Sequence, residues 1–162
     1  MKYASTRSID HVKTVSAAQA IKQGLAEDGG LFMPKEIPAL TMPEILALKD
    51  KTYIDRAVYV LSKLLTDYTE EELRRDCEAA YSETKFPGGA APLVKVDDRI
   101  YSLELWHGPT CAFKDMALQL MPRLLCRALD KTGEKRDAMI LVATSGDTGK
   151  AALEGYCDVD RI

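Results

Sequence analysis

The spacing of apolar residues predicts a mostly helical first half. Between Tyr53 and Leu65, apolar side chains recur at helical spacing and so share one face. Thr69 and Glu72 have the spacing of a capping box, in which each side chain bonds the other residue's backbone N–H at a helix start. From such signals we expect helices at 17–23, 41–49, 53–65 and 69–83, and a short strand at 31–33.

The second half alternates strands with helices. Residues 93–96 and 100–105 predict a hairpin, and Tyr101, Leu103 and Leu105 have the alternation of a half-buried strand. The remaining predicted elements are a helix at 115–130, a buried strand at 138–143 and a helix at 148–156. Pro122 should kink the first of these helices or shift its start. This order predicts a parallel sheet and an α/β fold class.

A stretch rich in proline and glycine, residues 86–92, is the one plausible boundary. We therefore expect a mostly helical N-terminal domain at 1–92 and the beginning of an α/β domain at 93–162. That second domain would be incomplete, because a hairpin and one further strand are too few for a doubly wound sheet. The strand at 138–143 would keep an unpaired edge, through which the chain could self-associate.

Composition excludes several classes of function. The chain is 46% hydrophobic and 29% charged, which are globular values, and its net charge is −3. With no basic cluster, this charge argues against nucleic-acid and membrane partners. The N-terminus lacks the apolar core of a signal peptide, and four cysteines form no C-x-x-C pair or zinc-ligand spacing. We expect a cytoplasmic protein with reduced, mostly packed or inert thiols and no metal.

Lys114 lies where a predicted strand turns into a helix. The apolar residues Ala112 and Phe113 precede it, and such surroundings make a neutral amine easier to keep. A neutral amine is a nucleophile and a base. The simpler interpretation is a surface lysine at a helix start, although a cation there opposes the helix dipole.

A glycine-rich loop at 144–149 follows the predicted buried strand and opens a helix. Such a loop presents free N–H groups and a positive dipole end to a carboxylate or phosphate. The alternative is an ordinary turn in which Asp147 caps the helix. Gly149-Lys150 does not make a nucleotide-binding P-loop, because Thr144 and Ala151 stand where that motif needs glycine and serine or threonine. Lys150 is expected to be solvated, with contact to a substrate phosphate as the alternative.

Four segments together resemble one enzyme family. They are Val15–Gly24, Asp28–Pro34, His107–Asp115 and Ala143–Gly149. In this order they resemble threonine synthase, a pyridoxal-phosphate (PLP) enzyme of fold type II, with Cys111 where leucine is more usual. The resemblance covers nearly the whole chain. It implies that residues 93–162 begin the parallel-sheet domain of a fold type II PLP enzyme.

The resemblance also implies the chemistry. The family converts O-phospho-L-homoserine and water to L-threonine and phosphate, the last step of threonine biosynthesis. Lys114 would form the Schiff base with PLP and serve as general acid and base. The residues expected at the cofactor are Lys114, Phe113 and Asp147. The residues expected at the substrate are Thr144, Ser145, Gly146, Asp147 and Thr148. His107 is expected to orient or support the site, although a catalytic pair with Asp115 is conceivable.

Two alternatives remain open. One is another fold type II lyase, such as a hydroxy-amino-acid dehydratase; Asp147, where sibling enzymes usually have asparagine, and the helical first half favour threonine synthase. The other is a non-catalytic, truncated relative. Threonine synthases continue well beyond residue 162, and the family's residues for the PLP phosphate lie there. We therefore expect these 162 residues to be an N-terminal fragment that is inactive alone.

Overall fold

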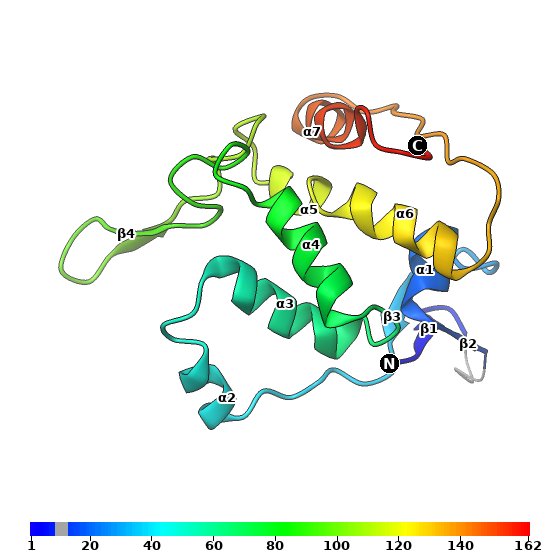
Figure 1. The fold of residues 1–162 in the computed structure, drawn as a ribbon, viewed down its shortest axis with the longest axis horizontal. Helices are drawn as coiled ribbons and strands as arrows, with labels where there is room; N and C mark the ends of the chain where they lie inside the picture. The colour runs from blue at the N-terminus through cyan, green and yellow to red at the C-terminus, as the bar shows by residue number, and fades with distance from the viewer. Residues whose placement is uncertain (9–12) are drawn as a thin grey trace. The chain divides into compact units, whose positions relative to one another are not determined.

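The computed structural model describes residues 1–8 and 13–162 (Figure 1). The chain forms two compact units, and each is built from two separate stretches. The first unit comprises Met1–Arg74 and Leu124–Lys135, and the second comprises Arg75–Arg123 and Arg136–Ile162.

A small antiparallel sheet lies near the start of the first unit. Its strands β1 (Tyr3–Ser5), β2 (Thr14–Val15) and β3 (Phe32–Pro34) are ordered β2-β1-β3. The predicted strand at 31–33 is confirmed with a shift of one residue. Helix α1 (Ala17–Gln23) has the predicted bounds, because the Ser16 side chain accepts a hydrogen bond from Gln19 N at its start.

The three helices that follow α1 begin at threonine caps. Helices α2 (Met42–Ala47), α3 (Tyr53–Leu64) and α4 (Glu70–Ala80) confirm the three predicted there, and α4 continues into the second unit. Thr41, Thr52 and Thr69 each make reciprocal capping bonds with the acidic residue three positions later. Glu44 also joins α2 to α3, since Lys63 Nζ and Tyr59 Oη donate to it at 2.8 and 2.5 Å. These bonds lower the pKa of the Glu44 carboxyl group.

The C-terminal part of helix α6 (Met121–Lys131) belongs to the first unit. Tyr68 Oη donates to Leu124 O at 3.0 Å, and Lys131 Nζ lies 2.8 Å from Glu72 Oε2. These contacts tie a helix from the second half of the sequence to the N-terminal helices. The compact units therefore differ from the predicted division at residue 92, and the stretch 86–92 lies inside the second unit.

The second unit contains the hairpin of β4 (Leu93–Lys95) and β5 (Tyr101–Leu103), helix α5 (Asp115–Leu118) and helix α7 (Asp147–Tyr156). The predicted helix at 115–130 is broken before Pro122, so α6 starts afresh at Met121, as the proline suggested. The half-buried strand predicted at Tyr101 and Leu103 is wrong in its burial, because both side chains are 55% exposed. Apolar and polar residues alternate along β5 as predicted, but no other element among the described residues covers the apolar face of the hairpin.

The segment 138–143 forms no strand, which corrects the prediction. Its side chains still alternate, since Met139 and Leu141 are 83% and 86% exposed whereas Ile140 and Val142 are 37% and 38% exposed. The only backbone bond recorded from this segment to another part of the described chain joins Ala138 N to Arg161 O at 2.9 Å. A strand needs a paired neighbour along its length, and the described residues do not supply one. The fold is α/β with two antiparallel sheets; the predicted parallel sheet is not formed by the described residues.

The described helices include none that is long and apolar enough to cross a membrane. The four cysteines are free thiols. Cys77 is buried, whereas Cys111 and Cys157 are exposed, so these two thiols are not packed. A hydrogen bond with Asp158 raises the pKa of the Cys157 thiol, which lowers its fraction of reactive thiolate.

Asp55 should make the stability of the chain depend on acid. Hydrogen bonds from the Thr52 side chain and from Arg74 lower the pKa of the Asp55 carboxyl from 3.8 to about 2. Its contribution is therefore fully present above pH 4 and is lost as the pH falls towards 2. We expect Asp55→Asn, which cannot ionise, to unfold with a flatter pH dependence in urea over this range. The exposed Asp50→Asn variant is the control, and identical curves for wild type and Asp55→Asn would contradict the expectation.

Candidate active site

Lys114 lies directly before helix α5, at its N-cap position, with φ −60° and ψ −27°. Its Nζ is 4.5 Å from the centroid of the Phe113 ring, in a cation–π contact. Phe113 is 58% exposed, whereas the preceding residue, Ala112, is buried. The predicted junction at the start of a helix is confirmed, but Phe113 does not pack into the core. Its ring is partly open to solvent.

Asp115 anchors the loop that precedes Lys114. The side chain is fully buried, and its two oxygens accept hydrogen bonds from Thr110 N and Thr110 Oγ1 at 2.8 and 2.7 Å. Gly108 approaches so closely that a Cβ there would overlap the Asp115 side chain. The carboxylate therefore fixes the path of the Gly-Pro-Thr turn.

His107 contacts other residues. Its Nε2 lies 2.7 Å from Glu104 Oε2, and its Nδ1 lies 3.2 Å from the carbonyl oxygen of Pro87. The ring also stacks on Trp106. These contacts favour the supporting role expected for His107, because both ring nitrogens are engaged away from Asp115 and the conceivable catalytic pair is not formed.

The loop predicted to bind substrate opens helix α7. Gly146 is the N-cap residue with φ 74° and ψ −142°, a left-handed conformation that favours glycine, and no side chain bonds at the cap. The interpretation of Asp147 as the cap is therefore wrong; it is the first residue of the helix and is exposed. The first N–H groups of α7 are left for another acceptor, at the positive end of the helix dipole.

A groove of about 710 Å³ lies against this loop. Thr144 and Gly146 line it together with Thr110 and Lys150. Lys150 Nζ donates to the Thr110 carbonyl at 3.1 Å, so Lys150 is not the purely solvated residue expected from the sequence. The structure thus brings two of the predicted substrate residues to the Gly-Pro-Thr turn. Lys114, Phe113, Ser145, Asp147 and Thr148 are not among the described residues that line this groove.

Helices α5 and α7 pack side by side (Figure 1). Gly155 is a point of close approach, since a Cβ there would collide with the carbonyl of Leu118. This packing places the helix that follows Lys114 against the helix that follows the glycine-rich loop. Sequence reasoning missed this contact; a glycine inside a helical pattern is the only signal that could have indicated it.

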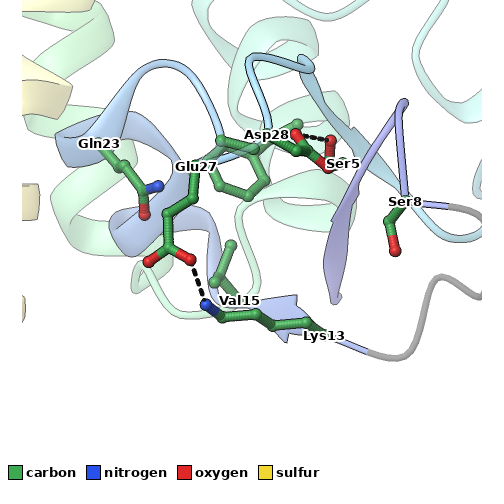
Figure 2. Close-up of a pocket in the computed structure, with 9 residues that line it drawn as sticks. Ser5, Ser8, Lys13, Val15, Gln23, Glu27 and Asp28 are labelled. Carbon is green, nitrogen blue, oxygen red and sulfur yellow. Dashed lines mark hydrogen bonds and ion pairs between the residues drawn. The ribbon is translucent and has the colours of Figure 1, made fainter.

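A second hollow, of about 140 Å³, lies in the first unit (Figure 2). Figure 2 shows Lys13 and Glu27 as an ion pair, 2.6 Å apart, at one side of it. Ser5 Oγ donates to Asp28 Oδ1 at 2.6 Å, and Gly30 N donates to the same oxygen. These polar groups satisfy one another, so the Asp28-Gly-Gly motif here shapes a turn.

Comparison with known proteins identifies the family. The family model described as threonine synthase N terminus matches residues 2–81. A threonine synthase from Pseudomonas aeruginosa is 37% identical over 163 residues, covering 100% of this chain and 34% of the relative. Threonine synthase-like 1 from Homo sapiens is 39% identical over 168 residues, covering 98% of this chain and 22% of the relative.

Solved structures agree with these relatives. A crystal structure of PLP-bound threonine synthase from Brucella melitensis matches with a TM-score of 0.89 and 40% identity, over 99% of this chain and 34% of that one. Threonine synthase from yeast matches with the same TM-score at 36% identity. The fold is thus that of part of a PLP-binding biosynthetic enzyme. The chain belongs to the threonine synthase family, and it spans between 22% and 34% of the length of the relatives named above.

The tight contact at Gly155 gives a stability test with an unusual sign. Glycine to alanine inside a helix normally stabilises by up to about 1 kcal/mol. Here we expect Gly155→Ala to destabilise by about 1–3 kcal/mol, because the added methyl group collides with the Leu118 carbonyl. Urea unfolding measures this change, and Leu153→Ala, at an exposed position of the same helix, is the control. A stabilised Gly155→Ala variant would show that α5 and α7 are not packed in this way.

Proposed function

We propose that this chain is part of a threonine synthase that converts O-phospho-L-homoserine and water to L-threonine and phosphate with PLP. The supporting observation is the pairing of two features in the second unit. Lys114 starts one helix, the uncapped Gly146-Asp147 turn starts another, and the two helices pack together. The backbone that carries both matches a PLP-bound threonine synthase closely.

The residues present fit part of such a cofactor. Lys114 is half-buried rather than enclosed, in keeping with an amine that can attach covalently to an aldehyde. The exposed face of Phe113 beside it suits an aromatic ring. PLP, when bound, supplies an electron sink for charge that develops on the substrate. We place Lys114, Phe113 and Asp147 at the cofactor.

The chain's own groups would bind and orient the substrate. The free N–H groups at the start of α7 and the side chains of Thr144, Ser145 and Thr148 suit a carboxylate. Gly146 lets the loop turn without a side chain between those groups and the ligand. Lys114 would hold and move the proton at the substrate Cα and at its neighbouring carbon, as general acid and base.

The remaining parts of the proposal concern the chain as a whole. Because it spans about a third of the matched threonine synthase structure, we propose that it is a fragment with no turnover by itself. Its exposed Met139 and Leu141 would favour self-association of the isolated chain. We assign the proposed enzyme to the cytoplasm, in keeping with its free thiols.

A dehydratase is less well supported than a threonine synthase, since the relatives described above are named threonine synthase or threonine synthase-like. The identities of the relatives do not separate the non-catalytic alternative from the catalytic one. The threonine synthase-like 1 protein is as similar to this chain, at 39% identity, as the synthases are. Reaction of Lys114 with PLP tests the non-catalytic alternative, because a chain that does not bind PLP would not be labelled there.

Lys114 should be the lysine that reacts with PLP. We expect borohydride reduction of the protein with PLP to label the peptide that contains Lys114, because its amine is accessible at a helix start. Lys114→Ala should lose this label. Lys131→Ala should keep it, because the ammonium group of Lys131 pairs with Glu72 in the wild type and is not the proposed target. In an active full-length enzyme, loss of the proton transfer alone should lower the rate by about 10²–10⁴-fold. Labelling of another lysine with Lys114 unmodified would contradict the assignment.

Asp147 should affect the ligand more than the fold. Asp147→Asn keeps the size of the side chain, and no capping bond is lost, so the free energy of unfolding should change by less than about 0.5 kcal/mol. If Asp147 faces the ring, the absorption spectrum of bound PLP should change. Spectra of the two proteins with PLP, alongside their urea unfolding curves, test this. An unchanged spectrum would place Asp147 outside the cofactor site.

A further inference from the structure

A single hydrogen bond joins the two segments that carry the proposed site. Lys150 lies in the first turn of α7, and its Nζ donates to the carbonyl oxygen of Thr110 at 3.1 Å, across 40 residues of sequence. A cation near a helix N-terminus is unfavourable for the helix dipole. The helix dipole therefore does not explain why the Lys150 ammonium lies there, whereas its hydrogen bond to the Thr110 carbonyl does.

Thr110 is held from its other side as well. Its N–H and hydroxyl groups both donate to the buried carboxylate of Asp115, the residue that directly follows Lys114. Bonds to charged partners are the stronger kind of hydrogen bond in proteins. Lys150, Thr110 and Asp115 thus form a continuous connection from α7 to the backbone of Lys114.

The connection also borders the groove. Thr110 and Lys150 line it together with Thr144 and Gly146 of the glycine-rich loop. Glu154, the acidic side chain that lines the same groove, is paired with Lys85 at 3.0 Å. The charge of Lys150 is therefore directed to the Thr110 carbonyl, at the edge where the two segments meet.

We propose that Lys150 is a positioning residue that fixes the Gly-Pro-Thr turn, and with it Lys114, against the start of α7. This inference rests on the proposed function for its catalytic meaning. Its structural content is independent of PLP: without the Lys150 bond, the turn at 108–111 should open more often. Side chains of the loop at 144–148 would then meet Lys114 in a less defined geometry.

The first measurement is amide hydrogen exchange of the full chain without PLP. Thr110 N is bonded to Asp115, and Cys111 N is bonded to Gly108 O, so both amides report on the turn. We expect Lys150→Met to speed their exchange by about two- to tenfold, the effect of losing one hydrogen bond. Lys150→Arg should restore slow exchange because it keeps a charged donor.

Lys85→Met is the matched control. It removes a lysine that pairs with Glu154 of α7 but leaves the bond from Lys150 to the Thr110 carbonyl intact. Its exchange at Thr110 and Cys111 should equal that of the wild type. Equal exchange in wild type and Lys150→Met, or equal acceleration in Lys85→Met, would overturn the proposal.

The second measurement uses PLP itself as the probe. Borohydride labelling of Lys114 should be slower in Lys150→Met than in the wild type by a similar factor, and Lys150→Arg should recover the rate. Faster exchange without slower labelling would refute the positioning of Lys114. If the wild type is not labelled at Lys114, the proposed function fails, and the exchange measurement by itself still decides whether Lys150 fixes the turn.

Discussion

A buried carboxylate determines where Lys114 can lie. Burying Asp115 is costly unless its charge is compensated, and Thr110 compensates it with two hydrogen bonds. Those bonds are short only if the Gly108-Pro-Thr turn folds back onto α5, with Gly108 against the carboxylate. The position of the lysine therefore follows from the solvation of its neighbour. Asp115 therefore contributes to the geometry of the candidate site by holding the turn that precedes Lys114.

Sequence patterns predicted the parts of the fold that depend on near neighbours. Helices α1, α2 and α3 start where their caps indicate, because a capping bond joins residues only three positions apart. The break at Pro122 is equally local. Burial was predicted less well: the β5 side chains and the segment at 138–143 need partners that lie far away in sequence. An apolar pattern shows what a segment could bury, not what covers it.

The same distinction holds at the candidate site. The motif spacing placed Lys114 and Gly146 at helix starts, and both lie there. Three features could not be predicted: the bond from Lys150 to Thr110, the contact of Gly155 with Leu118, and the start of α7 at Asp147, which leaves Gly146 as its cap. The two contacts depend on how α7 packs against the segment around α5, and the spacing of residues within one helix does not specify that. The sequence predicted a solvated Lys150 because its acceptor, the Thr110 carbonyl, lies outside its own helix.

The interleaving of the two units constrains when the protein can fold during synthesis. The first unit includes Leu124–Lys135, where Leu124 and Lys131 contact Tyr68 and Glu72. Domains generally fold from the N-terminus as the ribosome releases them. Here the first unit cannot be completed until the segment bearing Lys114 and α6 has left the exit tunnel. Until then Leu124 and its neighbours are missing from the core, and the nascent chain exposes the apolar surface on which a chaperone would act.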